Sequence, residues 1–333
     1  AVAKLKKHKL YPGPVLIILA TSSTVWATQE AAEQFKGAEM KLESLNFLEV
    51  VRHFENLPVA EIVRIYGAIG GVPAYLDAWD AARSFKENIC RLVLTPSGAL
   101  YGEADAVISA ELRELSAYST ILAAIARGEN KLNDIFHATG FSRAKISVYL
   151  KNLAAFNIVE KVVSFETGGW ENAKKGVYQI KDTFVNFWFK FVYPNMSNLY
   201  LLSPEEFYDT YIEKELDAYL ERYFREVCTE YLLILNQMGQ LPFAIKRVGT
   251  WIGKTGRIDI VAQSEDRRSI IGFCNWDKPM MTMDMCENMA MAMEQARLTS
   301  DDYYLFSATD FEPALQSYVV RDPRFKLINM NEL

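Results

Sequence analysis

The chain has 333 residues, half of them hydrophobic and 13% aromatic, which is enough apolar material for two or three separate cores. Its net charge of −6 argues against a chain that is basic throughout. The four cysteines are too widely spaced to suggest a disulfide framework, and the three histidines are too isolated to suggest a zinc site or a catalytic triad. No segment approaches the ~20 unbroken apolar residues that cross a bilayer, so we expect a cytoplasmic protein with no membrane contact.

The first predicted element is a buried strand over Val15–Ala20, which follows a Pro-Gly-Pro turn and leads into polar residues. Lysines before this apolar run imitate a secretory signal peptide, but the run is too short for one. From Phe47 to Leu94 the apolar residues take helical spacing, which Gly70, Gly71 and Pro73 interrupt. This pattern predicts a helix, a tight turn and another helix.

Three helices and a hairpin are predicted next. The helices cover Ser119–Ala126, Lys131–Ala138 and a segment from the capping residue Ser142 to about Leu153, and the strands cover Ile158–Phe165 and Gly176–Ile180. This order predicts a winged helix. Residues 127–181 hold nine Lys and Arg against five Asp and Glu, a charge of +4 that leaves −10 elsewhere, so nucleic-acid contact would be confined here. The basic candidates are Arg143, Lys145 and Lys151 on the third helix and Lys174 and Lys175 in the wing.

The last part of the chain alternates helices with strands, which predicts an α/β domain. Ser203, Pro204 and Glu206 begin a long helical stretch that reaches Gln237. A further helix runs from about Met283 to Leu298 and carries methionines at every fourth position, a stripe that favours core packing or a partner surface over copper binding. The predicted strands are Phe243–Val248, Arg257–Gln263, Ser269–Trp276, Tyr303–Ser307 and Lys326–Met330.

Two further motifs have a simpler structural interpretation. Gly253-Lys254-Thr255 imitates the end of a phosphate loop, but the required earlier glycine is replaced by Val248, and a hairpin turn is the better prediction. The aromatic residues between Phe184 and Tyr193 could stack on bases, but so much apolar area favours burial in a core.

Four sequence stretches, in two pairs, resemble a known family. Arg257-Ile-Asp-Ile-Val-Ala262 with Gly272-Phe-Cys-Asn-Trp276, and Gly70-Gly-Val-Pro-x-Tyr-Leu76 with Leu42-x-x-Leu-x-Phe47, are similar to prokaryotic AAA+ type ATPases that carry a winged helix and a C-terminal restriction-endonuclease-like domain. The resemblance implies a mixed α+β multidomain chain of the α/β type. Its parts would be an AAA+ core remnant with a sensor-1-like strand (1–50), a helical lid (51–115), a winged helix with an aromatic linker (116–198) and a degenerate PD-(D/E)xK nuclease-like domain (199–333).

The nuclease motif of that family is incomplete in this chain. Two carboxylates must hold a divalent ion, and a lysine must stabilise developing charge. In the family pattern the second strand reads Gly-Glu-Cys-Lys-Trp, so Asp259 is kept, Glu226 corresponds to the first acid, Phe273 replaces the Glu and Asn275 replaces the Lys. An aromatic ring cannot hold Mg²⁺ and an amide carries no charge, so we expect no nuclease activity, no metal and no cofactor.

The chain also lacks the family's phosphate loop, since only about fourteen residues precede Val15 and the required βα units cannot fit there. We therefore expect no ATP hydrolysis unless a longer gene product supplies an upstream phosphate-loop half. Two functions remain open. One is a non-catalytic module that binds double-stranded DNA through the winged helix, and the other is a scaffold that binds a partner protein through the lid or the Met-rich helix.

Overall fold

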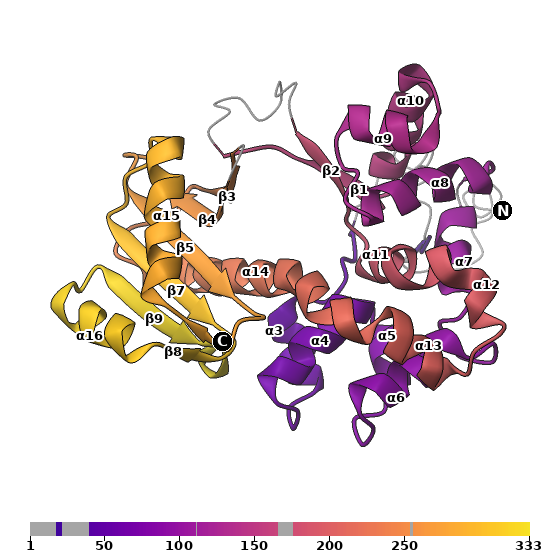
Figure 1. Ribbon diagram of the computed structural model, residues 1–333, viewed down its shortest axis with the longest axis horizontal. Coiled ribbons are helices and arrows are strands. Elements are labelled where there is room, and N and C mark those ends of the chain that lie inside the picture. The colour runs from indigo at the N-terminus through magenta and orange to yellow at the C-terminus, as the bar shows by residue number, and fades with distance from the viewer. Residues whose placement is uncertain (1–17, 22–39, 111, 166–175, 254–255) are drawn as a thin grey trace, which may run out of the picture. The chain divides into compact units, whose positions relative to one another are not determined.

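The computed structural model describes residues 18–21, 40–110, 112–165, 176–253 and 256–333 (Figure 1). The chain divides into two compact units, Ala1–Lys41 and Leu42–Leu333, and the helices and strands given below belong to the second. In the first unit, residues 18–21 form no strand and Ile18 is 80% exposed. The rest of the strand predicted over Val15–Ala20 lies outside the described residues, so that prediction is not confirmed. Within the described ranges, no helix combines the length and apolar character that a bilayer crossing requires.

Short helical segments follow one another between residues 47 and 109, where the sequence predicts a lid. Helix α4 ends where Gly70 adopts a φ of +69°, and Pro73 lies in the first turn of the next helix. Gly71 is required by contact, because a Cβ there would lie 1.9 Å from the carbonyl oxygen of Leu45. The predicted turn between two helices is confirmed. The segments are α3 (Phe47–His53), α4 (Val59–Ile69), α5 (Pro73–Ala78), α6 (Phe85–Ile89), the π-helix Cys90–Leu94 and α7 (Glu103–Ser109).

Three helices and a two-stranded antiparallel hairpin come next, in the order that the sequence predicts. Gly140 ends the second helix in the left-handed conformation, with a φ of 68°, and Ser142 caps the third. In the hairpin, Val159 pairs with Ile180 and Val162 pairs with Val177. The elements are α8 (Leu115–Ala126), α9 (Leu132–Thr139), α10 (Arg143–Ala155), β1 (Val159–Val162) and β2 (Val177–Ile180).

The aromatic segment after the hairpin is buried. Phe184, Phe187, Trp188 and Phe191 are at most 1% exposed and belong to the large hydrophobic core that also contains residues of α4, α8 and α14. These rings are therefore inaccessible to bases. They pack in the core, as the sequence analysis favoured. The segment comprises α11 (Thr183–Phe187), the π-helix Trp188–Val192, the 3₁₀-helix Tyr193–Asn195 and α12 (Met196–Leu199).

A five-stranded mixed sheet forms the C-terminal part, preceded by α13 (Pro204–Tyr211) and the long helix α14 (Glu213–Gln237). The strand order is β3-β4-β5-β7-β9, with β3, β4 and β5 antiparallel and β7 and β9 added in parallel (Figure 1). The remaining elements are β3 (Arg247–Ile252), β4 (Arg257–Gln263), β5 (Ser269–Asn275), β6 (Met280–Met281), α15 (Met283–Ala296), β7 (Asp302–Ser307), β8 (Asp310–Phe311), α16 (Pro313–Arg321), β9 (Phe325–Asn329) and the 3₁₀-helix Met330–Glu332.

The two faces of this sheet pack into different cores. Ile260 and Ile270 belong to the large core with α14, whereas Val261 and Ile271 pack with Met289 of α15. The methionine stripe is thus a packing surface, although Met280 and Met291 are exposed. The antiparallel β3 and β4 confirm the predicted hairpin around Gly253. The first strand was predicted too early, over Phe243–Val248: Phe243 and Ile245 are buried without belonging to a strand, and α16 was not predicted.

Candidate functional site

Helix α10 carries the basic side chains that the sequence predicts for nucleic-acid contact. Ser142 begins the helix by accepting the N–H of Lys145 at 3.2 Å. Arg143 and Lys151 are exposed and Lys145 is half-buried. The thirteen residues of α10 contain no Asp or Glu. The helix therefore presents positive charge without an acidic side chain of its own to cancel it.

Aromatic rings and an amide hold two of these cations in place. The Arg143 Nε donates to Asn133 Oδ1 of α9 at 3.0 Å, and its guanidinium lies 4.0 Å from the centre of the Phe136 ring. The Lys145 ammonium lies 4.4 Å from the centre of the Phe141 ring. Such cation–π contacts restrict the conformations of long side chains before any ligand is present. These side chains therefore lose less conformational entropy on binding. The positive surface of α10 is thus partly preorganised.

The opposite side of α10 is anchored to the rest of the unit. The Tyr149 hydroxyl donates to the Glu114 carboxylate, and Asn152 Nδ2 donates to the Tyr118 hydroxyl at 2.8 Å. Asn152 is therefore engaged with α8. Lys174 and Lys175, the predicted wing contacts, lie outside the described residues.

Asp259, the acid that the family resemblance assigns to a nuclease motif, lies at a β-bulge. Between β3 and β4 the step from Gly249 to Trp251 is matched by the longer step from Val261 to Ile258. The extra residue of β4 breaks the alternation of its side chains, so that Ile258 and Val261 share one face of the sheet. Asp259 points to the other face, toward α14.

The residue Asp259 is 7% exposed, and its carboxylate is occupied by protein donors. Its Oδ1 accepts from Nε of Arg225 on α14 and Nε of Arg257 on its own strand, both at 3.0 Å, and its Oδ2 accepts the backbone N–H of Cys274 at 3.1 Å. Two guanidinium groups therefore stand where a divalent cation would have to bind. Arg257 could have been suspected from its position two residues before Asp259 on one strand, but nothing local indicates Arg225.

Phe273 and Asn275, at the positions of the family's Glu and Lys, lie on the sheet face opposite Asp259. Phe273 packs against the core formed with α15, while its neighbour Cys274 packs on the α14 side. The buried Asn275 amide donates to Ser307 Oγ at 3.0 Å and to the carbonyl oxygen of Lys278 at 3.2 Å. The structure does not bring the predicted site residues together.

Glu226, the predicted first acid, is also turned away from Asp259. It is exposed and accepts from Arg222 Nε at 2.8 Å. The acid of α14 that lies on the Asp259 side is Glu221, four residues before Arg225. Burial, followed by the nearby Asp277 carboxylate, raises the pKa of Glu221 above its ordinary value. Among the described residues, no group of three His, Cys, Asp or Glu side chains could hold a metal ion.

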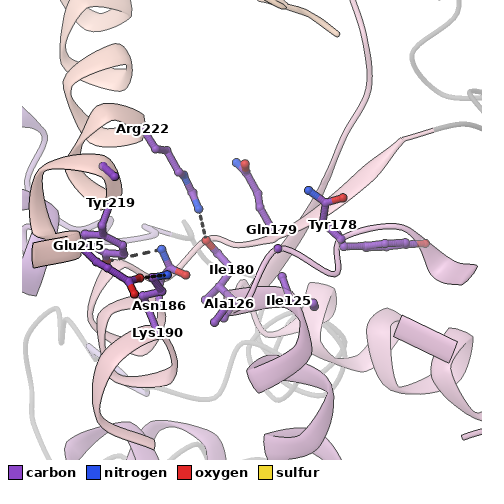
Figure 2. A pocket seen from close by; sticks show the side chains of 13 residues that line it. Ile125, Ala126, Tyr178, Gln179, Ile180, Asn186, Lys190, Glu215, Tyr219 and Arg222 are labelled. Atoms are coloured by element: carbon purple, nitrogen blue, oxygen red, sulfur yellow. Dashed lines mark hydrogen bonds and ion pairs between the residues drawn. The ribbon is translucent and has the colours of Figure 1, made fainter. Parts of the chain in front are cut away.

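A pocket of about 290 Å³ lies between β2, α11 and α14 (Figure 2). Both cations of its lining already pair with carboxylates of the chain: Lys190 pairs with Glu215 at 2.6 Å, and Arg222 pairs with Glu226 at 2.8 Å. The pocket therefore offers no uncompensated charge to an anionic ligand, and the surface of α10 is the stronger candidate site.

The described residues form a mixed α+β fold. Comparisons with known proteins give the following similarities. A family model described as archaeal and bacterial proteins of unknown function matches residues 188–294, from the aromatic segment to α15. A protein of Methanocaldococcus jannaschii, described as uncharacterized, is 29% identical over 276 residues, or 82% of this chain. The chain spans 61% of the length of that relative. No solved structure matches the chain.

Proposed function

We propose that this chain is a non-catalytic C-terminal portion of an AAA+-type ATPase that binds double-stranded DNA through its winged helix, α8 to α10 with the β1–β2 hairpin. The observation that carries this proposal is the surface of α10, where Arg143 and Lys151 are exposed and no acidic residue is present. A helix of this kind fits the major groove of a duplex, with its cations near the phosphates.

Charge distribution supports binding at this one place. The chain as a whole carries −6, so most of its surface repels phosphate, while residues 127–181 carry +4. The partly preorganised Arg143 and Lys145 lose less freedom on binding than unrestrained side chains would. Lys174 and Lys175 in the proposed wing would add further phosphate contacts.

The absence of catalysis is supported by the surroundings of Asp259. A phosphodiesterase of the PD-(D/E)xK kind needs its acids and lysine at one metal ion. Here Arg225 and Arg257 occupy the Asp259 carboxylate, and Phe273 packs on the opposite face of the sheet. The nuclease-like domain would therefore act as a support for the DNA-binding part.

A second candidate function is ATP hydrolysis by a longer protein that includes this chain. A longer protein is favoured by the relative, of which the chain spans 61%. The genomic sequence upstream of the codon for Ala1 tests this idea. A continuous reading frame with G-x-x-x-x-G-K-[ST] supports it, and an immediate stop codon removes it.

DNA binding is tested by fluorescence anisotropy of a labelled 24-base-pair duplex titrated with the chain from low to high salt. We expect Lys145→Ala and Lys151→Ala each to weaken binding and to reduce the slope of log K against log salt by about 1. Lys246→Ala is the matched control, because Lys246 is an exposed lysine of the sheet region that pairs with Glu265. Absence of binding by the unmodified chain at low salt rejects the proposal and leaves the protein-scaffold alternative.

A further inference from the structure

The exposed face of α10 has a specific composition beyond its charge. The exposed positions of its first three turns are Arg143, Ala144, Ser147, Val148 and Lys151, which recur at the spacing of one helix face. Between the two cations the face carries only small side chains and one valine. The Ser147 hydroxyl donates back to the carbonyl oxygen of Arg143 at 2.9 Å, so it lies close to the helix and does not cover its neighbours.

Val148 is the large apolar residue of α10 that the fold leaves exposed. Its side chain is 56% exposed, whereas Ile146, Tyr149, Leu150 and Leu153 of the same helix are buried. A β-branched residue is a poor helix former, so an exposed valine contributes little to the stability of α10. Ala144, four residues before it, and Ser147, beside it, have short side chains that leave the Val148 methyl groups accessible.

We propose that Val148 contacts the 5-methyl group of thymine in the major groove of B-form DNA, so that α10 prefers sites with thymine at that position. This inference rests on the proposed DNA-binding function. In the major groove the thymine methyl is the apolar feature that a base pair offers, and side chains such as Ala or the Thr methyl contact it. Arg143 and Lys151, on either side of Val148 along the helix, would hold the helix at the phosphates or the guanine edge while the valine lies at the groove floor.

The occupant is duplex DNA and not duplex RNA, for two reasons. The deep, narrow major groove of A-form RNA does not admit a helix, and uracil lacks the 5-methyl group. A protein partner is disfavoured because two exposed cations, Arg143 and Lys151, lie on the same face as the exposed valine, and interface cores are generally depleted in charge.

The test compares two 24-base-pair alternating duplexes, one of dA and dT and one of dA and deoxyuridine, in the same low-salt buffer. The second lacks every major-groove methyl group but keeps the phosphates and the pairing. We expect the unmodified chain to bind the thymine duplex about fourfold more tightly, which corresponds to the ~0.8 kcal/mol of one buried methyl group. Val148→Ala should bring this ratio close to 1, and Val320→Ala, which alters an 86% exposed valine on α16, should leave it unchanged.

The outcomes separate the inference from the function on which it rests. Binding of both DNA duplexes with equal affinity by the unmodified chain overturns the role of Val148 and leaves DNA binding standing. A thymine preference that persists in Val148→Ala also overturns it, as does an RNA duplex bound as tightly as the thymine duplex. Failure to bind any duplex at low salt overturns the proposed function itself. Circular dichroism of both variants checks that α10 remains folded.

Discussion

Arg225 and Asp259 form a largely buried ion pair, with Arg225 Nε 3.0 Å from Asp259 Oδ1 and side chains that are 14% and 9% exposed. The pair joins α14 to the bulge of β4. The Asp259 carboxylate thus holds the helix to the sheet. The interaction therefore serves the packing of the C-terminal part.

Removal of one member of this pair is expected to destabilise the fold. Asp259→Ala leaves the Arg225 charge buried without its partner, and we expect the free energy of unfolding to fall by about 3 kcal/mol. Arg257→Ala should cost less than ~1 kcal/mol, because that side chain is 43% exposed. Urea denaturation followed by circular dichroism measures both values. If the two variants lost equal free energy of unfolding, burial would not determine how much each side chain of this cluster contributes to stability.

Introducing the Glu and the Lys that the family resemblance places in the nuclease motif should not produce cleavage. We expect Phe273→Glu with Asn275→Lys to show no Mg²⁺-dependent nicking of supercoiled plasmid, because both side chains lie on the face opposite Asp259. The introduced Glu would also lose the apolar contacts of Phe273 and lower the melting temperature. Nicking that requires Mg²⁺ and disappears when Asp259→Ala is added would contradict the geometry of the sheet.

The pH dependence of stability should report on Glu221. Its pKa is raised in the fold by burial and by Asp277, so the stability that protonated Glu221 contributes is complete below the unfolded pKa of about 4.3 and is lost as pH rises through the folded pKa. Glu221→Gln imitates the protonated form. We therefore expect this variant to be more stable than the unmodified chain at pH 7.

The same comparison includes its own control. The stability difference between Glu221→Gln and the unmodified chain should shrink as pH falls below about 4, where both states of the chain carry a protonated Glu221. Asp277→Asn should reduce the effect of Glu221→Gln, because it removes a carboxylate that raises the pKa. Thermal melts at several pH values give the difference, and a gain that is constant with pH would rule out titration of Glu221.

Gly71 should tolerate no side chain. Gly71→Ala places a Cβ 1.9 Å from the Leu45 carbonyl oxygen, and because that neighbour is backbone, we expect a loss of about 2–4 kcal/mol. Gly102→Ala is the matched control, since a Cβ there meets nothing within 4 Å and the residue has an ordinary negative φ. Differential scanning fluorimetry should show a large fall in melting temperature for the first variant only.

Much of the order of elements could be predicted from local sequence. The turn at Gly70 and Pro73, the cap at Ser142 and the strand Arg257–Gln263 were predicted where the structure has them. These signals depend on residues that are close in sequence, because capping, turn formation and periodic burial act over a few positions. The strand predicted over Phe243–Val248 was misplaced because burial alone does not require ladder hydrogen bonds: the Ile245 N–H donates instead to Asn236 Oδ1 at 2.8 Å.

By itself, the sequence determined that Asp259 lies on a strand, that its motif is incomplete and that α10 is basic. Only the tertiary structure decided which side chains meet. The bulge turns Asp259 toward Arg225, thirty-four positions away in sequence, while Phe273 packs on the other face and Glu226 pairs with Arg222. The physical reason is that one extra residue in a strand reverses the alternation of its side chains, and such a bulge is set by pairing with another strand.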